Sequence, residues 1–254
     1  MPDRLDGTVA LVTGASSGIG ATTAVELARQ GAAVALAARR ADRLDELAAR
    51  IRAAGGMAAV IPADVSAEDR ARELVERTVA ELGRLDTLVN NAGLMLLGPV
   101  VGGPVAEWRR MVEVNLLGLM YCAHAALPHL LSAAQDSPRH VADLVNLSSV
   151  AGRIARNGSA AYNATKHAVV AFSEALRQEV AARHVRVSVV EPGVTETELA
   201  GHNRPEVIEQ MNRRFGDIKR LQAADIAEII GFIVTRPPHV NINELMVRPA
   251  EQEA

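Results

Sequence analysis

Tyr162 and Lys166 lie four residues apart in the segment Ser159–Phe172, whose sequence is typical of a helix. Residues at this spacing share one face of a helix. The chain has only two tyrosines and two lysines, so the pairing is informative. A phenol has a reference pKa of about 10, and a nearby ammonium group lowers it. We therefore predict that Tyr162 protonates a carbonyl oxygen or deprotonates an alcohol, and that Lys166 lowers the pKa of Tyr162 and holds a cofactor ribose.

Ser149 stands thirteen residues before Tyr162, just after the apolar run Ala142–Leu147. Ligands bind at the carboxyl ends of parallel strands, and a serine hydroxyl there can donate a hydrogen bond to a carbonyl oxygen. The alternative, bonding to neighbouring backbone groups, suits Ser148 better than Ser149. The sequence has no His–Asp pair at a spacing that suggests acyl transfer.

A glycine-rich segment, Thr13–Gly20, separates the first apolar run from a helix-like segment. In a doubly wound sheet such a turn presents free N–H groups at a helix N-terminus to a diphosphate. We expect Gly14 to permit the tight turn, Gly18 to allow close approach and Gly20 to let the helix pack on the strand. The spacing is Gly-x-x-x-Gly-x-Gly, and the alternative is a plain loop between a strand and a helix.

The end of the second apolar run bears on the choice between NAD and NADP. An acidic residue there would bind the ribose 2′-hydroxyl, but Arg39 and Arg40 stand in its place. Arg39 can pair with a 2′-phosphate, which favours NADP(H); the alternative is that both arginines are merely solvated. Asp64 follows the third run, where we expect it to line the adenine site, to cap the next helix, or both.

The elements that position these residues follow a repeating pattern. Helix-like segments Ala21–Gln30, Ala41–Ala54 and Ala67–Leu82 are each followed by a glycine, the residue expected where a helix ends in a left-handed conformation. The alternation predicts one α/β domain over residues 1–254, a Rossmann-like doubly wound parallel sheet of about seven strands with helices on both faces. The apolar runs that predict its strands are Val9–Val12, Ala33–Ala37, Ala58–Ile61, Thr87–Val89, Ala142–Leu147 and Val185–Val190.

Composition excludes several other classes of protein. The 254 residues carry 27 basic and 30 acidic side chains, which argues against binding to nucleic acid or to an anionic membrane. The single cysteine, Cys122, excludes a disulfide scaffold and is expected in the core. No signal peptide and no run of 18 apolar residues is evident, so we expect a cytoplasmic protein. His124 and His129 have no metal-ligating neighbours at suitable spacing, so no metal is expected.

Six motifs occur in family order along nearly the whole chain, which resembles the short-chain dehydrogenase/reductase family in the branch of about this length. They are Thr13–Gly20, Asn90–Gly93, Asn115 within Val-Asn-Leu-Leu-Gly, Asn146–Ser149, Tyr162-x-x-x-Lys166 and Pro192-Gly193 followed by Thr195.

The resemblance implies a catalytic tetrad in which Asn115 holds a water that relays protons to Lys166, Ser149 orients the substrate carbonyl and Tyr162 is the acid and base. It implies a nicotinamide cofactor, with Val194 and Thr195 at the nicotinamide amide. The full set of expected cofactor-binding residues is Gly14, Ser16, Ser17, Gly18, Ile19, Gly20, Arg39, Arg40, Asp64, Val65, Asn91, Ala92, Gly93, Tyr162, Lys166, Pro192, Gly193, Val194 and Thr195.

Shorter segments resemble two subgroups, the reductase of clavulanate aldehyde and the 3-hydroxy acid and serine dehydrogenases. Among them are Met95–Pro99, Leu221–Glu228 and Asn241–Pro249. Both subgroups imply a small polar carbonyl compound or its alcohol as substrate. The family also implies a homodimer or homotetramer, for which the outer faces of the helices around Tyr121–Leu131 and Tyr162 are candidates.

The segment after Pro192-Gly193, residues 196–216, is polar, and we expect an irregular substrate lid there. An anionic group of the substrate is expected to meet Arg153, Arg156, His202 or Arg204, unless these side chains are simply solvated. Two alternatives to an NADP(H)-dependent reductase stay open: an NAD-linked alcohol dehydrogenase and a non-catalytic nucleotide sensor on the same fold.

Overall fold

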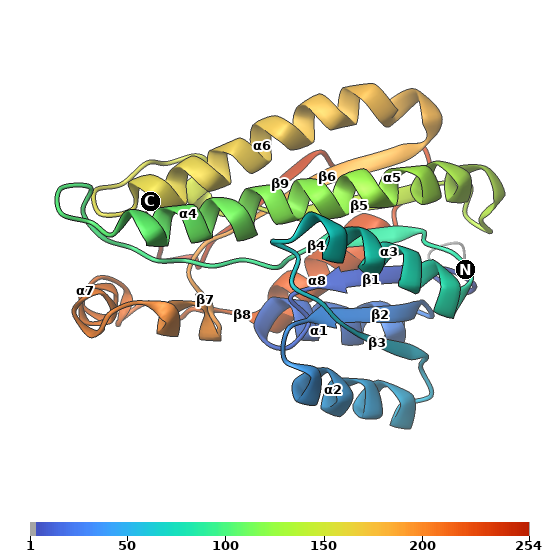
Figure 1. The fold of residues 1–254 in the computed structure, drawn as a ribbon, viewed down its shortest axis with the longest axis horizontal. Coiled ribbons are helices and arrows are strands. Elements are labelled where there is room, and N and C mark those ends of the chain that lie inside the picture. The colour runs from blue at the N-terminus through green and yellow to red at the C-terminus, as the bar shows by residue number, and fades with distance from the viewer. Residues whose placement is uncertain (1–3, 254) are drawn as a thin grey trace.

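The computed structural model describes residues 4–253. Seven parallel strands form one sheet in the order β3-β2-β1-β4-β5-β6-β9, and two short strands, β7 and β8, pair separately (Figure 1). The order reverses direction at β1, the switch point of a doubly wound sheet. The strands are β1 Val9–Thr13, β2 Ala33–Ala38, β3 Ala58–Pro62, β4 Thr87–Asn90, β5 Ala142–Leu147, β6 Val185–Pro192, β7 Thr195–Glu196, β8 Leu221–Gln222 and β9 Glu244–Val247.

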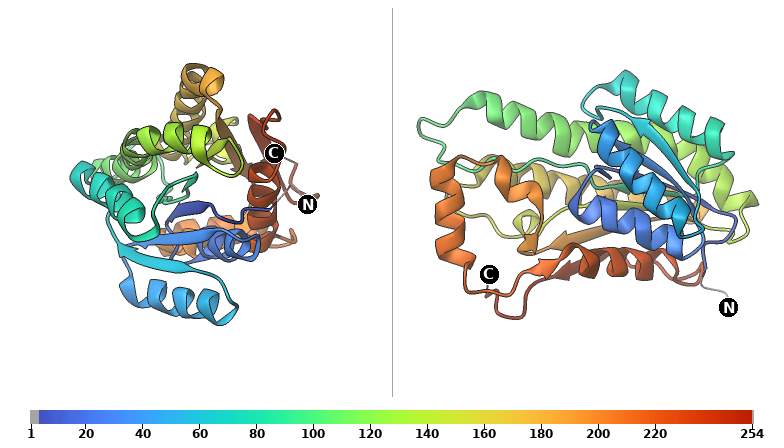
Figure 2. Two further views of the ribbon diagram at one scale, coloured as in Figure 1. Left: turned by 90° about the vertical axis from the view of Figure 1, so that its right-hand side faces the viewer. Right: turned by 90° about the horizontal axis from the view of Figure 1, so that it is seen from below.

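Helices cover both faces of the sheet, as Figure 2 shows. Helices α1, α2 and α8 pack on one face, and α3, α5 and α6 pack on the other. Their bounds are α1 Gly18–Arg29, α2 Ala41–Ala53, α3 Glu68–Leu82, α4 Val105–Val112, α5 Gly118–Asp136, α6 Ala160–Val180, α7 Pro205–Phe215 and α8 Ala223–Val234. The predicted Rossmann-like architecture is confirmed.

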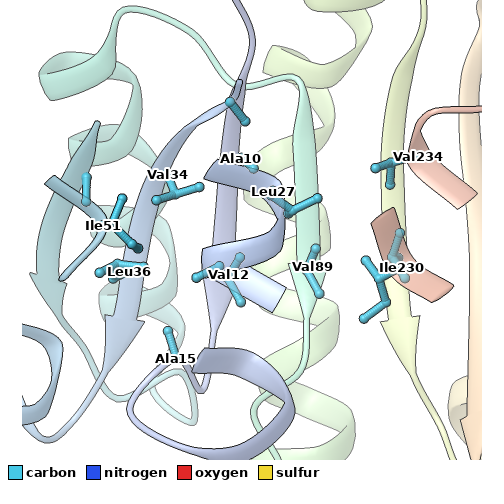
Figure 3. Close-up of a cluster of buried hydrophobic side chains, with 14 of the residues drawn as sticks. Ala10, Val12, Ala15, Leu27, Val34, Leu36, Ile51, Val89, Ile230 and Val234 are labelled. Carbon is cyan, nitrogen blue, oxygen red and sulfur yellow. The ribbon is translucent and has the colours of Figure 1, made fainter. Parts of the chain in front are cut away.

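The core is divided between the two faces because side chains alternate along each strand. Ala10 and Val12 of β1 face the cluster that includes Leu27 and Ile230 (Figure 3), whereas Leu11 faces the opposite cluster. Cys122 lies in that opposite cluster, as expected, and burial raises the pKa of its thiol to about 12. The strands are therefore anchored on both sides, which makes their carboxyl ends a rigid edge.

The six predicted strands are all present, and so are the left-handed glycines Gly31, Gly55 and Gly83 after three helices. The seventh strand, β9, pairs with β6 but was not foreseen. It lies at the edge of the sheet with Glu244 and Met246 exposed, and its apolar run, Leu245–Val247, is shorter than those of most of the inner strands.

A continuous helical segment, Val105–Asp136, joins α4 to α5 through a π-helical turn at Glu113–Leu117. By length and composition alone it could cross a membrane, a property that core helices of soluble proteins share. Here α5 packs against α3 and β5 and buries Leu119, Ala126 and Leu130. The apolar residues of α5 are thus explained by its packing in the core of the domain.

The segment at residues 196–216 is helical rather than irregular, which corrects that part of the prediction. A 3₁₀ turn spans Glu198–His202 and α7 follows. Pro205 at the first turn and the ion pair between Arg213 and Glu209 stabilise α7, and Val207 is buried. The polar residues therefore mark the outer face of an amphipathic helix.

Candidate active site

A cavity of about 970 Å³ opens at the carboxyl ends of the strands. It brings together nearly every residue that the sequence singled out, from turns after β1, β2, β3, β4, β5 and β6. Of the predicted residues, those that line it are Gly14, Ser16, Ser17, Gly18, Ile19, Arg39, Arg40, Asp64, Val65, Asn91, Ala92, Gly93, Ser149, Tyr162, Lys166, Pro192, Gly193, Val194 and Thr195. Gly20 and Asn115 do not line the cavity, but each contacts residues that do.

The glycine-rich turn fits a nucleotide diphosphate. Gly14 has a φ of +67°, and a Cβ atom there would lie 2.8 Å from the side-chain Nδ2 atom of Asn91. A Cβ atom at Gly20 would collide with the Gly14 carbonyl oxygen and with Asn91. The absence of a side chain at Gly20 therefore lets the start of α1 lie directly against the ends of β1 and β4. The turn leads into the N-terminus of α1, whose N–H groups face the cavity side of the sheet.

Arg39 and Arg40 both line the cavity beside this turn but are held differently. Arg40 donates hydrogen bonds to Ser16 (3.0 Å) and Ser17 (2.9 Å) and forms an ion pair with Glu198 (2.9 Å). Arg39 has no ion pair within residues 4–253. The arrangement fits a phosphate near the β2 end, since one guanidinium is free and the other lies against the turn.

Asp64 lines the cavity after β3. Its carboxylate accepts hydrogen bonds from the backbone and hydroxyl of Ser66, and these outweigh the effect of burial, so the pKa of Asp64 lies below its ordinary value. The N-cap of α3 is Ala67. The prediction that Asp64 caps this helix is therefore wrong, because the carboxylate closes the preceding turn instead.

Tyr162 and Lys166 share one face of α6, as predicted, with the Lys166 Nζ atom 5.9 Å from the centre of the Tyr162 ring. Both side chains are buried. Burial raises the pKa of Tyr162 to about 12, although a hydrogen bond with Ser149 opposes this effect. Burial also lowers the pKa of Lys166 to about 8. The phenol pKa is thus raised and not lowered as expected, because desolvation outweighs the opposing hydrogen bond with Ser149.

Lys166 donates a hydrogen bond of 2.7 Å to the carbonyl oxygen of Leu147. This contact ties α6 to the end of β5, the strand that leads into Ser149. Ser148 makes a second tie, because its hydroxyl donates to the carbonyl oxygen of Lys166 (2.9 Å). Ser148 therefore bonds across the fold, which corrects the expectation of purely local bonding for this residue.

Ser149 lies at the mouth of β5 with its hydroxyl directed toward the next strand. It donates to the carbonyl oxygen of Pro192 (3.3 Å) and accepts from the backbone N–H of Ala151 (3.1 Å). With Tyr162 beside it, the hydroxyl and the phenol converge on one point of the cavity. If the Ser149 hydroxyl rotates so that its hydrogen leaves Pro192 and points into the cavity, it and the phenol are two neutral O–H donors that can hold and polarise a carbonyl oxygen.

Asn115 sits in the π-helical turn between α4 and α5, and is 1% exposed. Its side-chain amide exchanges hydrogen bonds with Leu94, accepting from the N–H at 2.7 Å and donating to the carbonyl oxygen at 2.8 Å. A Cβ atom at Gly93 would lie 3.6 Å from the Asn115 amide oxygen and 4.0 Å from the Lys166 Nζ atom. The irregular turn thus places Asn115 beside Lys166, a frequent use of π-bulges.

Comparison with known proteins agrees with this geometry. A family model described as short chain dehydrogenase matches residues 8–207. An uncharacterized oxidoreductase of Staphylococcus saprophyticus is 39% identical over 249 residues, covering 97% of this chain and 99% of its own. The chain belongs to the short-chain dehydrogenase family.

Two solved structures of the family show the same fold with different nucleotides. A serine dehydrogenase complexed with NADP+ has a TM-score of 0.88 and 31% identity, covering 97% of each chain. A 3-ketoacyl-(acyl-carrier-protein) reductase from Brucella melitensis complexed with NADH has a TM-score of 0.85 and 29% identity, covering 96% of this chain and 98% of its own. The fold of this short-chain dehydrogenase therefore supports a nicotinamide nucleotide, and the choice between the two depends on side chains.

Several contacts of the short-chain dehydrogenase site were missed by the sequence reading. Asn90 donates to the amide oxygen of Asn146 (3.0 Å) across β4 and β5, and so locks the strands whose ends carry the site. Gln252, near the C-terminus, accepts a hydrogen bond from the N–H of Val194 (2.9 Å) and lines the cavity. The motif Asn90–Gly93 was a signal for the first, but nothing in the tail signalled the second.

The four residues expected at an anionic substrate group separate in the structure of this short-chain dehydrogenase. Arg153 pairs with Glu191 (2.7 Å) and Glu244, and Arg204 pairs with Glu107 (3.0 Å) and Glu206. His202 and Arg156 line the cavity. Within residues 4–253, neither Arg156 nor His202 forms an ion pair, so these two members of the set remain available to a ligand.

The part of the chain that the structure describes contains no candidate metal site. No three His, Cys, Asp or Glu side chains are grouped there so that they could hold a metal ion.

Proposed function

We propose that this short-chain dehydrogenase is an NADP(H)-dependent reductase that interconverts a small polar carbonyl compound and its alcohol. The observation that carries the proposal is that the buried side chains of Tyr162 and Lys166 line the same cavity as the half-buried Ser149 and the glycine-rich turn. When bound, the nicotinamide supplies the hydride. The chain supplies positioning, polarisation and the proton.

Tyr162 is the proton donor in the direction of reduction. With a pKa of about 12, its phenol is protonated at neutral pH and can give a proton to a carbonyl oxygen. Ser149 holds that oxygen by donating a second hydrogen bond. Lys166 holds the ribose and replaces the proton on Tyr162, and Asn115, fixed beside it, holds the water of this relay.

The preference for NADP(H) over NAD(H) is supported by Arg39, Arg40 and the absence of an acidic residue at this point of the sequence. Asn91, Ala92 and Gly93 form the floor under the cofactor, and Pro192 to Thr195 meet the nicotinamide. The helical segment 196–216 acts as the lid. We further propose a cytoplasmic homodimer or homotetramer without nucleic-acid, membrane or metal partners.

The test is consumption of NADPH and NADH with a panel of small aldehydes, ketones and oxo acids, for wild type and Tyr162→Phe. We expect turnover by wild type that is faster with NADPH and falls by about 10²- to 10⁴-fold in Tyr162→Phe. Equal rates in the two proteins would refute the role of Tyr162. Faster turnover with NADH would favour an NAD-linked dehydrogenase, and nucleotide binding without any turnover would favour a sensor.

A further inference from the structure

One wall of the cavity carries arginines that have no acidic partner. Arg156 belongs to the loop between β5 and α6, Arg214 belongs to α7, and both line the cavity. Within residues 4–253 neither forms an ion pair, nor does Arg248, which follows β9. Most other arginines of this chain are paired with a carboxylate, among them the neighbouring Arg153, Arg204 and Arg213.

Two nitrogen atoms of these side chains are buried without a hydrogen-bond partner in the described part of the chain. They are the Nη2 atom of Arg156 and the Nε atom of Arg248. A buried donor of a charged group that lacks an acceptor is strongly unfavourable. Burial, followed by the charges of Arg214 and Arg248, lowers the pKa of Arg156 from its ordinary value, so the three guanidinium groups lie near enough to repel one another.

The loop that carries Arg156 is held rigidly beside Tyr162. Asn163, the next residue after Tyr162, donates to the carbonyl oxygens of Ala151 (2.6 Å) and Ile154 (2.8 Å). Its amide oxygen accepts from the backbone N–H of Arg156 (3.3 Å). The backbone of Arg156 is therefore fixed by the same turn of α6 that carries Tyr162. An unpaired cation that lines the cavity from a loop anchored in this way is suited to bind a ligand.

The cofactor phosphates do not account for this cluster. Arg39 and Arg40 follow β2, whereas Arg156 follows β5, and β1 and β4 lie between these strands in the sheet. The acidic residues that line the cavity do not account for it either. Glu198 pairs with Arg40, Glu206 pairs with Arg204, and neither Asp64 nor Glu113 affects the pKa of Arg156.

We propose that Arg156, with Arg214 and Arg248 beside it, binds an anionic group of the substrate, so that the enzyme selects carbonyl compounds that carry a carboxylate or a phosphate. This inference rests on the proposed reductase function, because it concerns the same cavity. Planar guanidinium groups bind both anions through paired hydrogen bonds. An anion bound at Arg156 and Arg214, which line the cavity, offsets the repulsion among the three guanidinium groups, and its attachment to Arg156 directs the substrate carbonyl toward Tyr162 and Ser149.

Matched acid and neutral probes test the proposal by binding as well as by turnover. The probes are pyruvate, 3-oxobutanoate and 4-oxopentanoate with their methyl esters, and dihydroxyacetone phosphate with dihydroxyacetone. The Kd of each for the NADP+-loaded enzyme is measured by calorimetry, and kcat/KM is measured with NADPH. The proteins are wild type, Arg156→Gln, Arg156→Lys and Arg214→Gln. Arg213→Gln is the control, because Arg213 is exposed on the same helix and paired with Glu209.

For at least one acid or phosphate we expect Arg156→Gln to raise both Kd and KM by about tenfold to a hundredfold, because the variant loses a charged hydrogen-bond pair. We expect little change in either constant for the corresponding ester or for dihydroxyacetone. We expect Arg156→Lys to recover part of the loss, Arg214→Gln to show a smaller one and Arg213→Gln to show none. Comparison of the Kd values of the oxo acids with that of dihydroxyacetone phosphate shows whether the site prefers a carboxylate or a phosphate.

Wild type that binds acids no better than esters would overturn the anion site. An equal loss for acids and esters in Arg156→Gln would also overturn it, since that result indicates a structural role for Arg156. Tight, Arg156-dependent binding of an acid that is never turned over would instead contradict the reductase function and leave the anion site supported.

Discussion

The side-chain amide oxygen of Gln252 accepts a hydrogen bond of 2.9 Å from the backbone N–H of Val194, 58 residues earlier in the chain. Gln252 is 7% exposed, and it lies in the tail that follows β9. A carboxamide is also the polar group of nicotinamide. The chain therefore places a nicotinamide-like group on the N–H that we assign to the cofactor.

We predict that Gln252→Ala tightens binding of NADP+ and NADPH by about twofold to tenfold, the value of one competing hydrogen bond. Gln252→Glu weakens it, since a carboxylate is the stronger acceptor for the Val194 N–H. Fluorescence titration of NADPH measures both effects, with Glu253→Gln as the control from the same tail. Weaker binding in Gln252→Ala would show that Gln252 positions the loop at Gly193 and does not compete with the cofactor.

The high pKa of Tyr162 predicts opposite pH dependences for the two directions of the reaction. Oxidation of an alcohol needs the phenolate, whose fraction rises about tenfold per pH unit below a pKa of about 12. Reduction uses the phenol, which is protonated throughout this range. We expect initial oxidation rates to rise steadily from pH 7 to pH 10 and reduction rates not to rise. An oxidation rate that is level above pH 7 would contradict the raised pKa.

Lys166 is retained at a cost in stability. Its folded pKa of about 8 lies below the ordinary 10.5, so the unfolded chain binds more protons than the folded one between these values. Stability contributed by this group therefore rises with pH from 8 to 10.5, and the unfavourable effect of the buried charge is complete below pH 8. Removal of the charge should stabilise the protein at neutral pH.

We predict that Lys166→Met abolishes turnover yet raises Tm at pH 7 by about 2–4 °C. This shift corresponds to a gain of roughly 1 kcal/mol in the free energy of unfolding, the balance between removing the buried charge and losing the hydrogen bond to Leu147. The difference in Tm from wild type narrows between pH 8 and pH 10.5. Scanning calorimetry over this range checks the prediction, and Lys219→Met, which removes the other, exposed lysine, is the control. A lower Tm for Lys166→Met at pH 7 would mean that its bond to Leu147 outweighs the buried charge.

The different surroundings of Arg39 and Arg40 predict unequal effects on cofactor choice. Arg39 is free of ion pairs in the described chain, whereas Arg40 is engaged by Ser16, Ser17 and Glu198. We expect Arg39→Ala to raise KM for NADPH by about tenfold to a hundredfold and Arg40→Ala to raise it less, with KM for NADH changed little in both. Steady-state kinetics with NADPH and with NADH measure these KM values. Equal loss with NADPH and NADH would refute a 2′-phosphate site.

Local features of the sequence determined the fold class and most of the site. The strands of a parallel sheet are buried on both faces, so their apolar runs are continuous, and glycine after a helix reflects a backbone conformation. Tyr162 and Lys166 could be paired because helical spacing alone puts them on one face. The edge strand β9 could not be found in this way, since half its side chains are exposed and its pairing with β6 is a long-range contact.

Tertiary structure alone decided how these groups are charged and connected. Burial, which depends on the whole fold, raises the pKa of Tyr162 and lowers that of Lys166, opposite to what the isolated pair predicts. Tertiary structure also decides which residues distant in sequence become partners. Gln252 accepts a hydrogen bond from Val194, and Glu191 and Glu244 form ion pairs with Arg153. Arg156 is left without an ion pair near Arg214 and Arg248. Residue types and spacing specify which groups are present, and only packing specifies which of them are desolvated, neutralised or left free for a ligand.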